Sequence, residues 1–126
     1  MKKFITLLVS VLAAFNLFAQ NQNQDQAPAE KDFSVSIVSD NTVDGVRTVV
    51  FKPCAYVCTK QITVAVKGNV VESVEFVRGC SGNAQGVGAL IKGMTVDEAI
   101  KRLSGINCAG RGTSCPDQLA RCLKLL

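Results

Sequence analysis

Alternating apolar and polar residues predict a series of β-strands in the first part of the folded region. The stretch 33–38 alternates, Val46–Phe51 forms a second β-rich run, and Ile62–Val66 alternates cleanly. Gly68-Asn69 is a typical two-residue hairpin turn, because glycine adopts positive φ without strain. The run Val70–Val77 then returns as the partner strand, so the pattern predicts an antiparallel hairpin here.

The returning strand has a parity problem that predicts an irregularity. Val71 and Val74 are three residues apart, so a regular strand would point them to opposite faces of the sheet, whereas Val74 and Phe76 share a face. A β-bulge near Glu72-Ser73 would bring all three onto one face.

A helical period replaces the strand period after Gly79-Cys-Ser-Gly82. Val87, Leu90 and Ile91 fit one face of a helix, and Gly93 stands at a natural C-cap. The segment Thr95-Val-Asp-Glu98 is a capping box that opens a second helix. We expect Val96, Ile100 and Leu103 to face inward on that helix.

A third helix is predicted from Pro116 to Leu126, because proline is favoured as the first residue of a helix. Cys115 would then be its N-cap. Strands come first and helices follow, which predicts an α+β domain with a small antiparallel sheet packed against about three helices.

The N-terminal pattern predicts a targeting segment and a spacer. Met1-Lys2-Lys3 is basic, and an apolar run from Phe4 to Ala19 is the right length for a secretory signal peptide, although a retained membrane anchor is the alternative. Residues 20–32 are polar and predict a disordered linker. The sequence therefore predicts a signal peptide over 1–19, a domain over 33–126, export to the periplasm or medium, and no stable membrane span after cleavage. A misassigned start codon would instead make the protein cytoplasmic.

Composition excludes several classes of function. The 126 residues contain no His and no Trp, which excludes a Ser-His-Asp triad and a His-bearing zinc site. The net charge is +4, and because Lys2 and Lys3 lie in the predicted leader, only +2 remains after cleavage. This weak bias, with few aromatic residues, argues against nucleic-acid binding.

Six cysteines in so short a chain carry the candidate chemistry. Cys80 and Cys115 each lie just before a predicted helix, Cys58 enters one strand of the predicted hairpin, and Cys108 lies across a glycine-rich loop from Cys115. We expect these four to converge at one end of the sheet, where four thiolates suit zinc or an iron–sulfur cluster. Disulfides, which are common in exported proteins, and inert buried thiols are the alternatives.

The motif Thr113-Ser-Cys-Pro-Asp117 resembles the signature of the TSCPD domain family. The similarity extends over about residues 56–126 through further motifs, namely Cys58-Thr-Lys-Gln-Ile62, Gly79-Cys-Ser-Gly-Asn83, Gly93-Met-Thr-Val-Asp-Glu98 and Gly105-Ile-Asn-Cys108. The resemblance implies metal binding through Cys58, Cys80, Cys108 and Cys115. The family includes short stand-alone proteins and the C-terminal tail of adenosylcobalamin-dependent ribonucleoside-diphosphate reductases, so it also implies a link to nucleotide reduction.

A more distant similarity is to IscU-type iron–sulfur scaffolds. It rests on the order Cys58, Gly79-Cys-Ser-Gly82, Lys92-Gly93, Asp97-Glu-Ala99 and Cys115. The scaffolds have an acidic residue two positions after the first cysteine, where this chain has Lys60. The resemblance implies an IscU-like fold and, as a second function, an iron–sulfur scaffold or carrier.

Two smaller features complete the candidate sites. Gly79, Ser81, Gly82 and Asn83 could form an anion-binding nest, but the usual roles of these residues favour a tight turn capped by Ser81 or Asn83. Cys54 and Cys122 lie outside the set implied by the family and could pair as a disulfide.

Three functions follow for this chain. The first is a zinc-binding or iron–sulfur accessory module for a protein partner such as a nucleotide-reducing enzyme. About 94 residues cannot enclose a cobalamin cofactor and a radical site, so the chain is too short to catalyse that reduction alone. The other two are an iron–sulfur carrier and an exported binding module stapled by disulfides.

Overall fold

The structure is a computed structural model that describes residues 29–126. Residues Asp32–Leu126 form one compact unit. The predicted signal peptide and most of the predicted linker lie outside the described residues. Within residues 29–126, no helix is long and apolar enough to span a bilayer.

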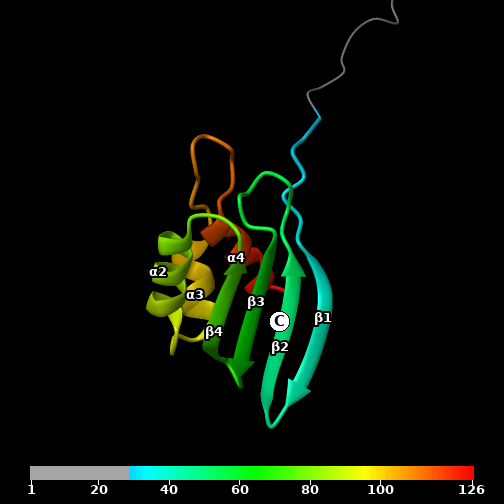
Figure 1. Cartoon of the computed structure of the whole chain (residues 1–126), viewed down its shortest axis with the longest axis vertical. Coiled ribbons are helices and arrows are strands. Elements are labelled where there is room, and N and C mark those ends of the chain that lie inside the picture. Colours follow the sequence, from blue (N-terminus) through cyan, green and yellow to red (C-terminus); the bar gives the residue numbers. More distant parts are fainter. Residues whose placement is uncertain (1–28) are drawn as a thin grey trace, which may run out of the picture. The chain divides into compact units, whose positions relative to one another are not determined.

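Four strands pair in the order in which they occur along the chain. They are β1 (Ser36–Val43), β2 (Val46–Lys52), β3 (Gln61–Lys67) and β4 (Val70–Val77), and every neighbouring pair is antiparallel (Figure 1). The Gly68-Asn69 turn connects β3 to β4, and Gly68 has the positive φ of 59° that this turn needs. The predicted antiparallel sheet is confirmed.

A bulge in β4 resolves the parity problem. Ala65 of β3 pairs with Ser73 and the next residue, Val66, pairs with Val71, so Glu72 is the extra residue on β4. Val71 is buried, while Glu72 and Ser73 are exposed. The predicted bulge is therefore confirmed.

The first strand differs from its prediction. Alternation predicted a strand over 33–38, but β1 begins at Ser36 and continues to Val43 through the polar segment Asp40-Asn-Thr42. This edge strand is exposed along almost its whole length, so burial does not select apolar residues there. Pairing with β2 extends the strand instead.

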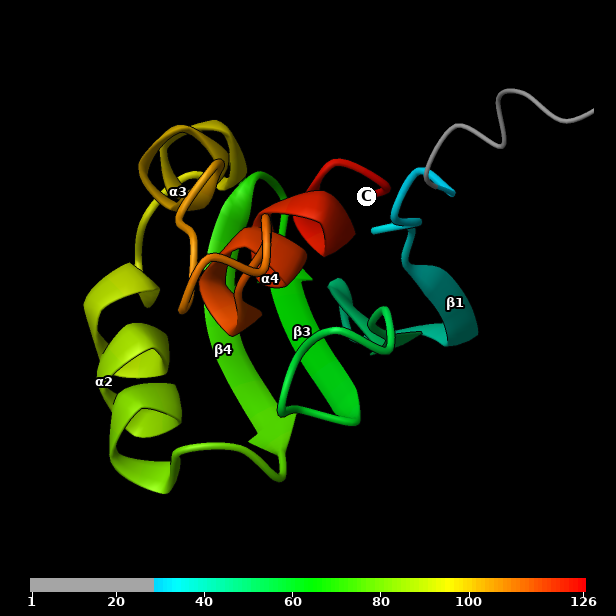
Figure 2. The same cartoon turned by 90° about the horizontal axis from the view of Figure 1, so that it is seen from above.

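Three helices follow the sheet, as predicted, and cover one of its faces (Figure 2). They are α2 (Ser81–Ile91), α3 (Val96–Leu103) and α4 (Cys115–Leu123). Helix α2 packs on β4, α4 packs on β3, and α3 packs on α4. The molecule is therefore an α+β fold with one helical layer over a four-stranded sheet.

The core lies between the sheet and the helices. Phe51, Ile62 and Val64 from the sheet and Leu119 from α4 have no exposed surface. Burying a side chain of this size contributes about 1.5–3 kcal/mol relative to leaving it in water. The capping box of α3 forms as predicted in one half, with the Thr95 side chain accepting a hydrogen bond from the Glu98 N–H at 3.3 Å.

Helix α2 is rotated from the face that its sequence predicted. Leu90 was expected to face inward, but its side chain is 74% exposed. The inward stripe is Ala84, Val87, Gly88 and Ile91, which has helical spacing and carries a glycine next to the strand. A Cβ on Gly88 would lie 3.1 Å from the Val74 carbonyl oxygen, so the missing side chain lets α2 approach β4 closely.

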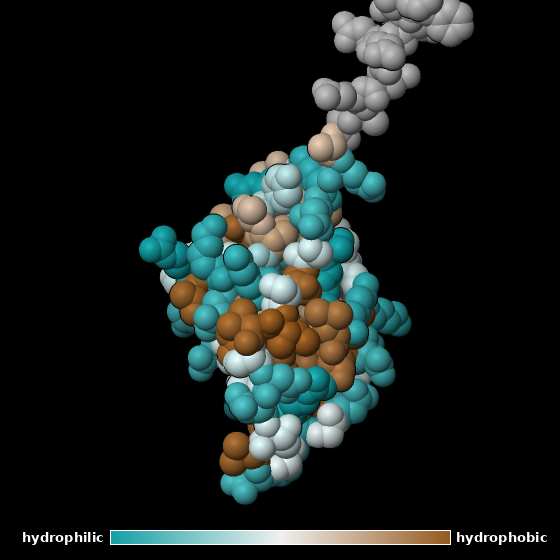
Figure 3. Space-filling model, turned by 90° about the vertical axis from the view of Figure 1, so that its right-hand side faces the viewer, coloured by the Kyte–Doolittle hydropathy of each residue, from teal (hydrophilic) through white to brown (hydrophobic). Residues whose placement is uncertain are grey.

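Apolar side chains gather in the middle of the side of the molecule that β1 borders (Figure 3). On this strand Ile37 is 46% exposed and Val38 is 63% exposed.

Arg47 of β2 pairs with Asp40 of β1 at 2.7 Å and donates a hydrogen bond to the Leu126 carbonyl at 2.5 Å, which ties the C-terminus to the sheet.

Candidate metal site

The segments that carry five of the six cysteines meet at one end of the sheet. Strands β2 and β4 both end there and β3 begins there, so residues 53–60 and the start of α2 lie at this end (Figure 1). The loop from residue 104 to 114, which leads into α4, lies at the same end. The antiparallel topology thus gathers distant parts of the chain into one region.

The segment with Cys58 is fastened to the end of β4. The hydroxyl of the buried Thr59 lies 3.0 Å from the carbonyl oxygens of Gln61 and Val77, and the Lys60 N–H donates to Val77 at 2.8 Å. Gly79 lies directly against this segment, since a Cβ there would be 3.8 Å from the Cβ of Cys58. The backbone therefore brings Cys58 beside the residue that precedes Cys80.

Cys80 is the N-cap of α2 and makes no side-chain capping hydrogen bond. The expectation that Ser81 or Asn83 caps this helix is wrong, because Cys80 occupies the extended capping position and α2 begins at Ser81. Cys80 is exposed, so its thiol neither caps the helix nor packs in the core.

Cys115 is the first residue of α4 and not its N-cap, which corrects the prediction. Ser114 is the N-cap, and its hydroxyl accepts a hydrogen bond from the Asp117 N–H at 3.1 Å. A hydroxyl is a better cap than a thiol, which explains why the helix begins one residue earlier than Pro116 suggested. Cys80 and Cys115 line the same narrow crevice, whose volume of about 10 Å³ suits a single water or ion better than an organic ligand.

Cys108 and Arg111 lie in a tightly folded loop. The Cys108 N–H donates to Thr113 at 3.1 Å, and the Arg111 N–H donates back to Cys108 at 3.1 Å. The Asn107 side chain accepts from the Gly112 N–H at 2.9 Å, and Gly112 has a φ of 88° that favours glycine. These bonds fold the loop back on itself between Cys108 and Cys115.

Arg111 reaches from this loop to the opposite segment. Its Nη1 donates a hydrogen bond to the Sγ of Cys58 at 3.5 Å. This hydrogen bond is the largest cause that raises the pKa of the Arg111 guanidinium, and the nearby sulfurs of Cys58, Cys108 and Cys115 raise it further. Arg111 therefore contacts Cys58 directly and is influenced by the charge of Cys108 and Cys115. The shared crevice connects the fourth predicted ligand, Cys80, to Cys115.

The polar residues around Cys115 are structural. Asp117 accepts hydrogen bonds from the Thr113 hydroxyl at 2.7 Å, from the Gly105 N–H at 2.8 Å and from Arg121 at 2.9 Å. Burial raises the pKa of Asp117, but these hydrogen bonds outweigh burial and hold the pKa below its ordinary value. Asp117 thus fixes the loop to the start of α4.

Gln118 joins three segments from a fully buried position. Its Oε1 accepts from the Cys54 N–H at 2.9 Å, and its Nε2 donates to the Phe33 carbonyl at 3.0 Å and to the Thr113 hydroxyl at 3.1 Å. Sequence reasoning missed this role and that of Arg111. The available signal for Arg111 was a lone cation in a glycine-rich loop between two cysteines.

Cys54 and Cys122 differ from the other four cysteines. Cys122 is fully buried in the core, and burial raises its pKa to about 12. Cys54 is half-buried and bonds through its backbone to Gln118, one helical turn before Cys122 on α4. All six cysteines of the chain lie among the described residues and all are free thiols, so their pairing stays a prediction.

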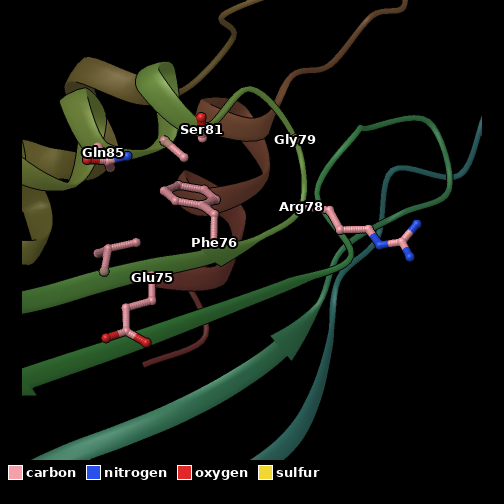
Figure 4. A pocket seen from close by; sticks show the side chains of 8 residues that line it. Glu75, Phe76, Arg78, Gly79, Ser81 and Gln85 are labelled. Carbon is pink, nitrogen blue, oxygen red and sulfur yellow. The ribbon is translucent and has the colours of Figure 1, made fainter.

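A wider hollow between β4 and α2 has a volume of about 360 Å³ (Figure 4). The Phe76 ring fills the space below the helix, while the Glu75 and Arg78 side chains point away from it (Figure 4). A ligand site needs a few polar groups that converge on the ligand. The charged side chains of this hollow do not converge, so it is a weaker candidate than the cysteine end.

The donor chemistry at the cysteine end fits a soft metal. Cys58, Cys80 and Cys108 are exposed and Cys115 is half-buried, so none of the four is sealed in the core. Thiolates select zinc and iron–sulfur clusters over oxygen-seeking cations. As the side chains stand, however, no group of three Cys, Asp or Glu within residues 29–126 is close enough to hold an ion. The four cysteines lie in one region, but their side chains do not converge on a common point.

Comparison with known protein families supplies one match. The TSCPD domain profile matches residues 34–126, which is most of the chain. The chain belongs to the TSCPD domain family. No curated protein and no solved structure matches it significantly, so the likeness to IscU-type scaffolds remains an expectation.

The structure gives the TSCPD signature of this chain a physical meaning. Thr113, Ser114 and Asp117 cap α4 and hold the preceding loop, and Pro116 lies in the first turn where proline is favoured. The Cys115 side chain takes no part in these hydrogen bonds. The other residues of the TSCPD motif therefore fix the backbone at the start of α4, where Cys115 lies.

Proposed function

We propose that this TSCPD domain is a metal-binding module in which Cys58, Cys80, Cys108 and Cys115 hold one zinc ion. The observation that carries the proposal is the location of these free thiols on four segments at the same end of the sheet. Four-cysteine zinc sites are usually closed and structural. Binding would therefore join the loop of residues 104–114 to the ends of β3 and β4.

Metal binding requires a rearrangement of side chains in this region. The four thiols have to turn toward one point, and the loop with Cys108 is the part best able to move because its tip is exposed and held by a few hydrogen bonds. Zinc would supply the energy that fixes this loop, since metal binding and local ordering are coupled.

Cobalt(II) substitution tests the ligand set. We expect the wild-type protein to bind one Co²⁺ and to develop the intense visible bands of tetrahedral cobalt thiolate. The variants C58S, C80S, C108S and C115S should each lose these bands or bind much more weakly, because a hydroxyl is a poor replacement for a thiolate ligand.

C54S provides the matched control for the cobalt titration. Cys54 lies in the same part of the molecule as Cys58, but it is outside the proposed set. Its substitution should leave the spectrum unchanged. Wild-type protein without thiolate bands, or a loss in C54S equal to that in C58S, would contradict the proposed ligands.

By family resemblance, we propose that the module serves a nucleotide-reducing enzyme as an accessory. A four-stranded sheet with three helices has no room for a cobalamin cofactor and a radical site, so the chain would act through a partner. Co-purification of a reductase subunit with the wild-type domain, but not with a variant that lacks all four cysteines, tests this link.

An iron–sulfur scaffold is the second candidate function. The observation that favours it is the exposure of Cys58, Cys80 and Cys108, because a cluster that is handed on must be reachable by its acceptor. Anaerobic reconstitution with iron and sulfide distinguishes the two. A scaffold would take up acid-labile sulfide and release it to an acceptor, whereas the zinc module would retain zinc.

A further inference from the structure

Arg111 is the basic side chain of the cysteine end with a direct contact to a predicted ligand. Its Nη1 lies 3.5 Å from the Sγ of Cys58, although the two residues are 53 positions apart. Arg78 is also near in sequence to a ligand, Cys80, but within residues 29–126 the hydrogen bond from an arginine to a cysteine sulfur comes from Arg111 and not from Arg78. The contact with Cys58 therefore distinguishes Arg111 from the other basic residues near the cysteines.

Hydrogen bonds within the loop of residues 104–114 hold the backbone on both sides of Arg111. The Arg111 N–H bonds to the Cys108 carbonyl, and the Gly112 N–H bonds to the Asn107 side chain. A Cβ on Gly112 would lie 2.9 Å from the Phe33 ring, so the loop backbone after Arg111 lies directly against the half-buried Phe33 side chain. This leaves the Arg111 side chain to extend toward Cys58.

The charge of a loaded site decides what the guanidinium would do. Four thiolates around a divalent zinc ion leave a net negative charge, which a guanidinium neutralises in part. A thiolate keeps lone pairs after it binds zinc, so one can accept the N–H hydrogen bond from Arg111. Partners of this kind orient metal ligands and commonly affect metal affinity by about 10- to 100-fold.

We propose that Arg111 is a positioning residue for the metal site, which orients the Cys58 thiolate and balances the charge of the loaded site. This inference rests on the proposed function, because it assigns a role within the four-cysteine site. It predicts that the arginine strengthens zinc binding, although arginine and zinc are both cations.

Zinc affinity measured by competition with a chromogenic chelator tests the inference. We expect R111Q to bind zinc about 10- to 100-fold more weakly than wild type. R111K should recover part of the loss, because it keeps the charge but lacks the planar donor geometry. Circular dichroism of each variant verifies that the fold is retained.

The control is R78Q, which removes the same charge at the same end of the domain. Within residues 29–126, Arg78 donates no hydrogen bond to Cys58. It should lower zinc affinity much less than R111Q does. Equal losses in R78Q and R111Q, or unchanged or tighter binding by R111Q, would overturn the role of Arg111. Wild-type protein that binds no zinc would instead refute the proposed function itself, so the two failures are distinguishable.

Discussion

At the scale of single residues, the carboxyl group of Asp117 shows how burial changes the value of one interaction. Asp117 and Glu98 are both the third residue of a helix, and each pairs with an arginine four residues later. The Asp117 side chain is 6% exposed, whereas the Glu98 side chain is 40% exposed. Only Asp117 also holds a loop, through Thr113 and Gly105.

We therefore expect D117N to lower the free energy of unfolding by about 1–3 kcal/mol, because it leaves buried groups without their charged partner. E98Q should cost less than about 0.5 kcal/mol, since exposed helical ion pairs contribute little. Urea denaturation at neutral pH measures both. A loss in E98Q as large as that in D117N would contradict the structural role of Asp117.

The pH dependence of stability gives the same residue a second signature. Because the folded state holds the pKa of Asp117 below its ordinary value, its contribution is present above about pH 4 and is lost as pH falls further. The difference in stability between wild type and D117N should therefore shrink on acidification below about pH 4. A difference that grows with acid would contradict the hydrogen-bonded carboxylate.

At the scale of elements, the glycines of α2 separate helix propensity from packing. Gly86 has open space around its Cβ position, whereas the Cβ position of Gly88 meets the Val74 carbonyl at 3.1 Å. Both lie in the same helix, so their backbone entropy is comparable. What differs is the distance to β4.

We expect G86A to stabilise the protein by about 0.5–1 kcal/mol, which is the usual gain from replacing glycine inside a helix. G88A should lose that gain and lower the melting temperature below that of G86A, because the new methyl group presses on a strand backbone. Thermal unfolding of the two variants tests the packing of α2 on β4. Equal gains would contradict the close approach.

The sequence predicted most elements of this fold because their patterns reflect burial. The hairpin at Gly68, the bulge at Glu72 and the start of α3 at Thr95 each follow from alternation or capping. The exposed strand β1 and the orientation of Leu90 were not predictable in this way, since pairing at an edge and a close glycine contact leave no apolar pattern.

At the scale of the whole molecule, the topology explains why cysteines distant in sequence lie at one end. In an antiparallel sheet with short hairpins, alternate connections share an end, so the β2–β3 and β4–α2 connections lie together. Sequence order could predict this common location. It could not predict the contact between Arg111 and Cys58, because that depends on how the loop of residues 104–114 folds.

The two extra cysteines belong to the body of the domain. Cys122 is part of the core, and Cys54 is linked through Gln118 to the helix that carries it. Because Cys54 and Cys122 are not among the proposed ligands, the number of free thiols distinguishes the metal module from the disulfide-stapled module. A metal module needs four reduced cysteines, whereas a disulfide-stapled binding module would oxidise all six.

Elemental analysis with a thiol count, on protein purified from its native compartment without added metal, tests the central claim most directly. We predict one zinc ion per chain and four thiols that become reactive only when a chelator removes the metal. Protein that contains no metal and has its cysteines locked in three disulfides would contradict the account.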